Sequence, residues 1–171
     1  EKYKLITNLE LFKEVNDMRD EVFPETKSIS EFHINFLLSK KYLPNSPYDL
    51  MLYLLFVSGR RIGELFLPDN FYIEDNCLRI RKIQKKRDLY ELIDCNPKQF
   101  MDLYNYFLEM ITKKNGDFLK TDTMRKIASV ILKFDFEDDS MKIKDLRPLY
   151  VAYQLKYNPN YSKKNLCLST K

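Results

Sequence analysis

Phe56-Val57-Ser58-Gly59-Arg60-Arg61-Ile62-Gly63-Glu64-Leu65 is the stretch of sequence that decides the fold. The apolar run that leads into it, from Leu50 to Val57, predicts a buried helix that the Ser-Gly pair ends. Ser46 and Pro47 are typical of the N-cap and the first turn of such a helix. The two arginines are therefore presented from the rigid end of a helix. Because a guanidinium stays charged and matches phosphate oxygens, we interpret Arg61 as a candidate phosphate-binding residue.

The composition is that of a globular protein with a small excess of positive charge. Of the 171 residues, 44% are hydrophobic and 32% are charged, and the formal net charge is +4. This balance permits a nucleic acid as a partner, although the placement of the charges matters more than their sum. One histidine (His33) and three cysteines without metal-ligand spacing argue against a zinc site or a disulfide framework. No apolar run is long enough to cross a membrane.

The apolar periodicity predicts a mainly helical chain with one small sheet. We expect helices at Asn8–Phe23, from Ser28 or Ser30 to Lys41, at Pro47–Val57, from Pro97 to about Asn115, at Thr121–Leu132 and from Pro148 to about Tyr157. Strands are expected at Phe71–Ile73, Leu78–Ile83 and Leu89–Ile93, with a charged hairpin tip at Gln84–Asp88. The predicted fold class is α+β: mainly α, with a three-stranded antiparallel sheet at the side of the helical body.

Pro24 divides the chain into two parts of unequal length. Residues 1–24 are interpreted as an N-terminal helix or linker, and residues 25–171 as one domain. The sequence stops inside a helical pattern, so we expect this domain to be truncated at its C-terminus. No internal repeat or low-complexity segment interrupts it.

Three basic elements stand at the ends of predicted helices and strands. They are Arg60 and Arg61 after the apolar helix, Lys85 and Lys86 at the hairpin tip, and Lys144 with Arg147 at a helix start. Pro148 is tolerated only in a first helical turn, which places Lys144 and Arg147 at or just before a helix N-terminus. Cations that converge there would stabilise the charge that develops on a phosphate during phosphoryl transfer. A lysine at the hairpin tip would be placed to protonate a leaving oxygen.

The order of these elements resembles the catalytic domain of the tyrosine recombinases and type IB topoisomerases, the DNA breaking–rejoining superfamily. Ser58-Gly59-Arg60-Arg61-Ile62-Gly63-Glu64-Leu65 is similar to the first arginine box of that family, Thr/Ser-Gly-x-Arg-x-x-Glu-Leu. The resemblance implies that Arg61 is the catalytic arginine and Glu64 a supporting carboxylate. It also assigns the catalytic lysine of the hairpin to Lys85, with Lys86 and Lys82 as the alternatives.

Lys144-Asp145-Leu146-Arg147 is similar to the second arginine box of the same family. Most recombinases have histidine at the first position of this box, whereas lysine there resembles the type IB topoisomerases of poxviruses. The Arg-x-x-Tyr spacing from Arg147 to Tyr150 is similar to that of telomere resolvases. The resemblance extends over roughly residues 28–171 and identifies 25–171 as a tyrosine recombinase-like catalytic domain. The similarity to poxvirus enzymes implies that a virus is one candidate source of the chain.

The resemblance implies an enzyme that cleaves and rejoins DNA strands through a phosphotyrosyl intermediate, as in site-specific recombination, DNA integration or resolution. It implies no cofactor and no metal. The catalytic set is Arg61, Lys85, Lys144 and Arg147, and the further DNA-binding set is Arg60, Lys82, Lys86 and Arg87. A late His or Trp is expected near or past Lys171 and the nucleophilic tyrosine further still, so the fragment itself is expected to be inactive.

The expected partner is double-stranded DNA, bound by a homo-oligomer (a dimer or a tetramer), and no membrane partner is expected. The expected location is inside the cell where the DNA is, which for a viral protein is the host nucleus or cytoplasm. Three other interpretations stay open. The chain is a type IB topoisomerase that relaxes DNA, a degenerate family member that binds DNA without cleaving it, or a helical interaction domain unrelated to DNA.

Overall fold

Helix α3 (Pro47–Ser58) forms the centre of the molecule, as the apolar run predicts. The computed structural model describes residues 31–42, 46–81 and 91–158. Every residue of α3 from Leu50 to Ser58 is buried, and the helix packs against α2, α5, α6 and α7. The Ser46 hydroxyl caps the helix by accepting a hydrogen bond of 3.2 Å from the Asp49 N–H. Neighbours on all sides explain why this helix is apolar all round.

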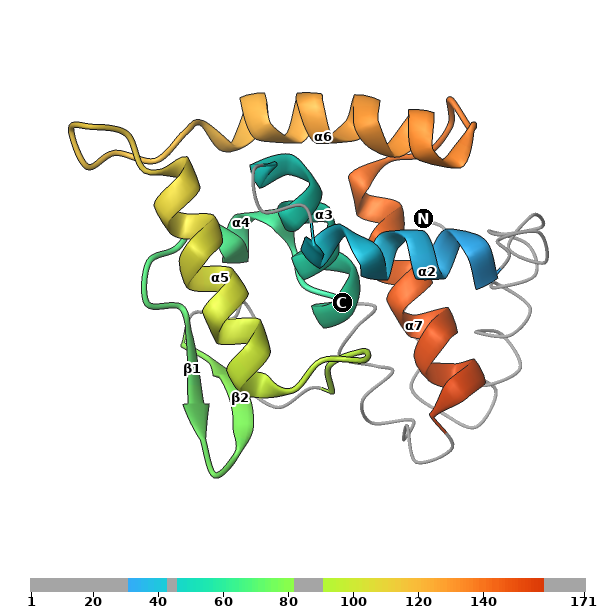
Figure 1. Cartoon of the computed structure of the whole chain (residues 1–171), viewed down its shortest axis with the longest axis horizontal. Helices are drawn as coiled ribbons and strands as arrows, with labels where there is room; N and C mark the ends of the chain where they lie inside the picture. The colour runs from blue at the N-terminus through green and yellow to red at the C-terminus, as the bar shows by residue number, and fades with distance from the viewer. Residues whose placement is uncertain (1–30, 43–45, 82–90, 159–171) are drawn as a thin grey trace, which may run out of the picture.

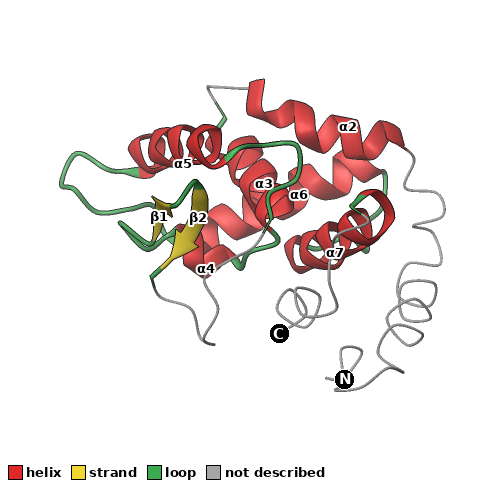
Figure 2. Ribbon diagram, turned by 90° about the horizontal axis from the view of Figure 1, so that it is seen from below, coloured by secondary structure: helices red, strands yellow, loops and turns green. Residues whose placement is uncertain are grey.

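The other helices surround α3 (Figure 1). They are α2 (Glu31–Ser39), the 3-10 turn η1 (Lys40–Tyr42), α4 (Ile62–Leu65), α5 (Pro97–Ile111), α6 (Thr121–Phe136), the 3-10 turn η2 (Ile143–Asp145) and α7 (Leu146–Tyr157). Helix α6 crosses one side of α3, with α5 and α7 on opposite flanks (Figures 1 and 2). Asn96 caps α5 as its sequence predicts, because its side chain accepts from the Gln99 N–H at 2.9 Å.

The sheet differs from the three-stranded prediction. Strands β1 (Phe71–Glu74) and β2 (Cys77–Ile80) pair antiparallel, with Phe71 opposite Ile80. No other strand occurs in residues 31–42, 46–81 and 91–158, and residues 91–93, expected in a third strand, are irregular there. The backbone of these residues forms hydrogen bonds with helices instead of with a strand. The Ile93 N–H donates to the Val57 carbonyl of α3 at 2.9 Å, and the Glu91 carbonyl accepts from the Tyr150 hydroxyl of α7 at 2.6 Å. The expected strand is wrong over this part.

A buried ion cluster joins three helical segments. Lys40 of η1 is 2% exposed and forms ion pairs with Asp49 at the start of α3 and with Asp135 in the last turn of α6. The Lys40 Nζ–Asp135 Oδ2 distance is 2.6 Å. The prediction that α6 ends at Leu132 is wrong, because the helix continues for one further turn to Phe136. The ion pair of Asp135 with Lys40 and the stacking of Phe136 on His33, with 5.0 Å between ring centroids, stabilise this last turn.

The fold is thus mainly helical with a small antiparallel sheet, in the general α+β class. Tyr104 and Phe107 of α5 lie in the core as expected, at 1% and 0% exposure. Among the described helices, none is both long and apolar enough to span a membrane. The helix expected at Asn8–Phe23 and the whole of residues 1–24 lie outside the described part of the chain.

The ion cluster yields a prediction about stability. Lys40→Met should lower the free energy of unfolding by about 3–5 kcal/mol, because two carboxylates would remain without their cation in a largely buried place. Urea denaturation measures the difference. The matched control is Lys41→Met in the same turn, which should change stability by less than about 0.5 kcal/mol. Adding Asp49→Asn and Asp135→Asn to Lys40→Met should restore stability, and no loss for Lys40→Met alone would contradict the account.

Candidate functional site

The end of α3 sets the position of the two arginines. Gly59 ends the helix in the left-handed conformation (φ 61°), and its N–H donates to the Leu55 carbonyl at 2.9 Å. The chain then turns to extended backbone at Arg61, which is the N-cap of α4. Arg60 is half-buried and Arg61 is exposed, so consecutive arginines leave the helix end in different environments.

Glu64 supports this turn. Its carboxylate accepts a hydrogen bond of 3.2 Å from the backbone N–H of Arg61. It also pairs with Arg60, with 3.9 Å between Arg60 Nη1 and Glu64 Oε2. A carboxylate at the third position of a helix commonly holds the N-cap backbone in this way. Glu64 therefore orients the segment that carries Arg61, while the supporting role in catalysis that the resemblance implies for Glu64 stays a prediction.

The second predicted pair lies where η2 runs into α7. Asp145 accepts a hydrogen bond of 2.8 Å from the Lys142 N–H, which fixes the start of η2. Lys144 is exposed, and Arg147 is half-buried in the first turn of α7. The first N–H groups of a helix carry a partial positive charge, so this end of α7 adds to the field of the two cations.

A contact between Gly59 and Tyr150 brings the two segments together. A Cβ atom on Gly59 would lie 2.3 Å from Tyr150 Cδ1, so the ring occupies the space that any larger residue would need. Tyr150 is one turn after Arg147 on α7, at the i+3 position that shares its face. Its hydroxyl donates to the Glu91 carbonyl at 2.6 Å, and Gln154 Nε2 donates to the same oxygen at 3.1 Å. One buried ring thus joins the end of α3, the start of α7 and the segment after the hairpin.

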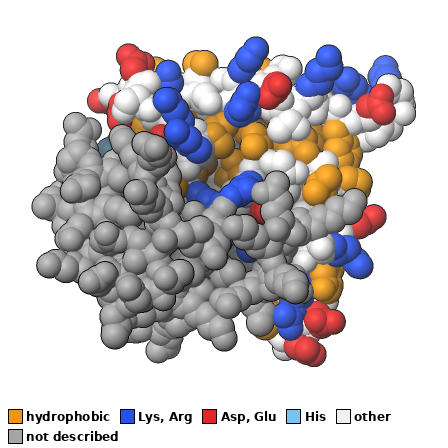
Figure 3. Space-filling model, turned by 180° about the vertical axis from the view of Figure 1, so that it is seen from behind, with side chains coloured by type: hydrophobic (Ala, Val, Ile, Leu, Met, Phe, Trp, Pro, Cys, Tyr) orange, Lys and Arg blue, Asp and Glu red, His pale blue; other side chains and the backbone are white. Residues whose placement is uncertain are grey.

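The two segments share one cavity of about 800 Å³. Eight of its twelve described lining residues are basic, and none of these twelve is a carboxylate. The lining residues are Arg60, Arg61, Ile62, Arg125, Lys126, Ser129, Val130, Lys133, Lys142, Ile143, Lys144 and Arg147. Seen from behind, an apolar band lies among Lys and Arg side chains (Figure 3). The cavity thus suits an anion larger than a single phosphate group.

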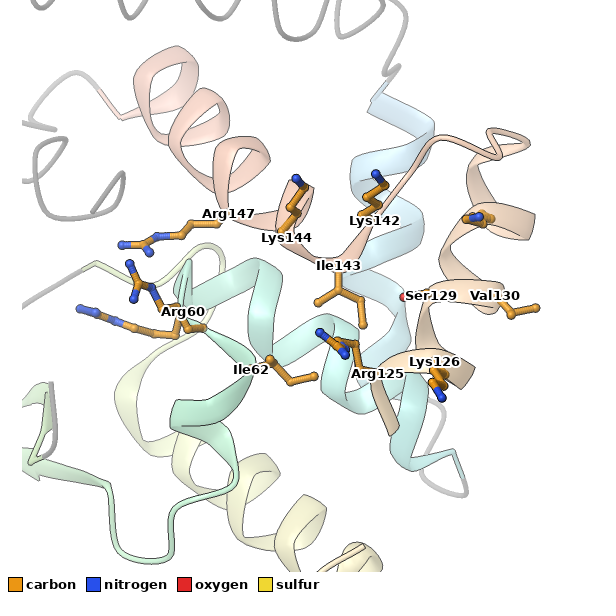
Figure 4. A pocket seen from close by; sticks show the side chains of 12 residues that line it. Arg60, Ile62, Arg125, Lys126, Ser129, Val130, Lys142, Ile143, Lys144 and Arg147 are labelled. Carbon is orange, nitrogen blue, oxygen red and sulfur yellow. The ribbon is translucent and has the colours of Figure 1, made fainter. Parts of the chain in front are cut away.

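Some of the predicted site residues lie together at the cavity, and others do not. The cavity brings together Arg60, Arg61, Lys144 and Arg147, while Glu64 is not among its described lining residues. The guanidinium groups of Arg60 and Arg147 lie at the same end of the cavity, whereas Lys142 and Lys144 turn their ammonium groups toward another side (Figure 4). The residues predicted to lie at or near a hairpin tip, Lys82, Lys85, Lys86 and Arg87, lie outside the described residues.

Four basic lining residues were missed by the sequence-based prediction. They are Arg125, Lys126 and Lys133 on α6, and Lys142 just before η2. A signal for the α6 residues was present, because the buried Met124, Ala128 and Leu132 recur every four positions and mark the opposite face of that helix. No motif connects them with the arginine boxes, so only the fold places them at the cavity.

None of the described tyrosines is among the residues that line the cavity. Tyr150 is 1% exposed and its hydroxyl is hydrogen-bonded, which confirms that it is a core residue. Burial, and then the negative charge of Asp94, raise the pKa of the Tyr153 hydroxyl. The Tyr150 hydroxyl is buried and already hydrogen-bonded, and the raised pKa of Tyr153 disfavours its phenolate, so neither residue is a suitable nucleophile. Within the described residues, no group of three or more His, Cys, Asp or Glu is placed to hold a metal ion.

Fold and cavity together define a mainly α protein with a basic site between α3, α6 and α7. Comparisons with models of protein families, with curated proteins and with solved structures found no match.

The glycines provide a graded test of the Gly59–Tyr150 contact. Gly59→Ala should lower the free energy of unfolding by about 2–5 kcal/mol, the sum of left-handed strain and overpacking against the Tyr150 ring. Gly116→Ala, also at positive φ but in open space, should lose only about 1–2 kcal/mol. Gly63→Ala, in helix α4 with open space around it, should be neutral or gain up to about 1 kcal/mol. Equal losses for Gly59→Ala and Gly116→Ala, measured by urea denaturation, would contradict the contact.

Proposed function

We propose that this chain binds double-stranded DNA through the basic cavity and serves as the catalytic domain of an enzyme that cleaves and rejoins DNA strands. One observation carries the proposal: Arg61, Lys144 and Arg147, singled out by two separate motifs, line the same cavity. If each motif were only solvated surface, nothing would require residues this far apart in the sequence to line the same cavity. The absence of carboxylates among the twelve described lining residues supports a polyanionic ligand.

Each residue has a role in this proposal. The forked guanidinium groups of Arg61 and Arg147 bind the non-bridging oxygens of the scissile phosphate and stabilise its developing charge. Lys144 adds a third cation, in the position where most recombinases have histidine. Lys85, which the resemblance assigns as the catalytic lysine, is proposed as the general acid for the leaving oxygen. In this reaction the tyrosine hydroxyl loses its proton and its oxygen bonds to phosphorus, while the bond from phosphorus to the deoxyribose oxygen breaks and that oxygen takes a proton from Lys85. The phosphotyrosyl bond conserves the energy of the broken bond, so the reaction needs neither ATP nor a metal.

A second candidate function is DNA binding without strand cleavage. It is supported by the tyrosines, because none of those in residues 31–42, 46–81 and 91–158 lines the cavity. Under the first proposal, the nucleophile comes from residues beyond these ranges or from another protomer. Relaxation of supercoiled DNA, as by a type IB topoisomerase, and assembly into dimers or tetramers on DNA stay predictions of the resemblance alone.

Removing the arginines tests DNA binding. Arg61→Ala and Arg147→Ala should each weaken binding of an arbitrary duplex of about 20 base pairs by roughly tenfold at 0.1 M salt, and lower the slope of log affinity against log salt by about 0.9. Fluorescence anisotropy at several salt concentrations measures both quantities. Arg147→Lys should keep the slope but recover only part of the affinity, because lysine lacks the bidentate fork.

The matched control is Lys113→Ala/Lys114→Ala, which removes two exposed cations in the loop between α5 and α6. These lysines do not line the cavity, so duplex affinity should change by less than about twofold. Thermal melts of every variant check that folding is intact. An Arg61→Ala variant with unchanged duplex affinity and unchanged stability would overturn the proposed function.

Covalent capture separates cleavage from binding alone. With a chain that includes the expected nucleophilic tyrosine, a protein–DNA adduct should form on nicked duplexes that trap a covalent intermediate, equally well with and without EDTA, because the proposed chemistry uses no metal. Gel electrophoresis under denaturing conditions detects the adduct. Loss of the adduct on adding EDTA would count against this mechanism. If a chain that includes the expected nucleophilic tyrosine binds duplex DNA tightly but forms no adduct, the result favours the non-cleaving function.

A further inference from the structure

Helix α6 presents a second row of basic residues to the cavity. Its core face consists of Met124, Ala128 and Leu132, each fully buried. The opposite side turns Lys126, Val130 and Lys133 toward the cavity, at the i, i+4 and i+7 positions of one helical face. Lys126 and Val130 are exposed and Lys133 is half-buried. This row is separate from both arginine boxes in sequence and in the fold.

An apolar floor separates the row from the arginines. It consists of Ile62 of α4 and Ile143 of η2, whereas Val130, which is 68% exposed, stands with the lysines on the α6 side (Figure 4). In the close view, Arg125, Lys126, Ser129 and Val130 stand on one side of the cavity, Arg60 and Arg147 on the other, with Ile62 and Ile143 between them (Figure 4). Basic residues on two sides of an apolar floor (Figure 4) suit contacts with separate phosphate groups better than contacts with a single one.

We propose that the α6 row binds DNA-backbone phosphates other than the scissile one, and so determines affinity without taking part in the reaction. This inference rests on the proposed function and extends it to new residues. A cavity of about 800 Å³ is in the range of a whole drug-sized ligand and leaves room for several sugar–phosphate units. The apolar floor suits the carbon faces of the deoxyriboses between them.

The chemistry of the row favours contacts with the backbone over reading of bases. A lysine ammonium binds phosphate as a point charge, and a valine side chain has no hydrogen-bonding group. No Asn, Gln, Asp or Glu, the side chains that pair with adenine and cytosine edges, is among the twelve described lining residues. The row should therefore strengthen the binding of every duplex to a similar extent.

The lysines are the residues to change. Arg125 is already paired with Asp122, at 2.8 Å between Nη2 and Oδ1, so its removal would mix two effects. Lys126→Ala/Lys133→Ala removes two cations and leaves the arginine boxes unaltered. Because each of these lysines is proposed to neutralise one phosphate, the salt slope should fall by about 1.8 and duplex affinity at 0.1 M salt by up to roughly 60-fold. Duplexes of unrelated sequence should be affected equally, and Lys126→Arg/Lys133→Arg should restore the slope.

The experiment compares three double variants of the full chain in one anisotropy series. Its probe is a duplex of about 20 base pairs at about 50–200 mM salt. The variants are Lys126→Ala/Lys133→Ala, Arg61→Ala/Arg147→Ala and the loop control Lys113→Ala/Lys114→Ala. The inference is supported if the α6 and arginine variants both lose slope while the loop control does not. It is overturned, with the proposed function intact, if the α6 variant behaves like the loop control and the arginine variant loses slope.

Two further outcomes would also overturn it. If neither the α6 variant nor the arginine variant alters duplex binding, the proposed function fails and the inference fails with it. If the α6 variant keeps its duplex affinity but loses affinity for an acidic amphipathic peptide, α6 is a protein-docking face. Charge reversal, Lys126→Glu/Lys133→Glu, repeats the test with a larger expected loss of duplex binding. Its thermal melt shows whether folding is preserved.

Discussion

The site depends on the packing of the Tyr150 ring against the backbone of Gly59. The ring fills the space that a Cβ atom would take, so the end of α3 and the first turns of α7 approach more closely than any residue but glycine allows. Arg60 and Arg61 follow that glycine directly, and Arg147 precedes the tyrosine by one turn. Because the Tyr150 hydroxyl also binds the Glu91 carbonyl, the same ring holds the segment after the hairpin. A single aromatic residue thus relates three segments that are far apart in the chain.

The distribution of charge distinguishes a structural from a functional use of cations. Lys40 is buried and paired with two carboxylates, Asp49 and Asp135, as a cation in a protein interior must be. The cavity has a different balance of charge: its twelve described lining residues include eight cations and no carboxylate, and the carboxylates that pair with Arg60 and Arg125, those of Glu64 and Asp122, are not among the lining residues. Mutual repulsion among so many like charges disfavours the folded state, and an external polyanion would relieve it. Proteins commonly tolerate such an unfavourable local arrangement, here like charges placed close together, where they bind ligands.

Short-range features of the sequence predicted much of the fold. The apolar run with its Ser46 cap defined α3, and Asn96 with Pro97 defined the start of α5, because caps act within a few residues. The third strand was predicted wrongly over residues 91–93, because α3 and α7 provide their backbone partners. Motifs predicted Arg61, Lys144 and Arg147 as site residues. The ion pairs of Lys40 and the α6 lysines were missed, because their surroundings come from segments that only the tertiary structure brings together.

The central claim is that the cavity between α3, α6 and α7 binds the DNA backbone. Backbone amide resonances of the chain, followed during titration with a short duplex, test it most directly. The account predicts that the largest shifts fall on Arg60–Ile62, on residues 126–133 of α6 and on residues 142–147. These segments line the cavity, whereas strands β1 and β2 do not. Shifts concentrated on β1 and β2, with these three segments unchanged, would contradict it.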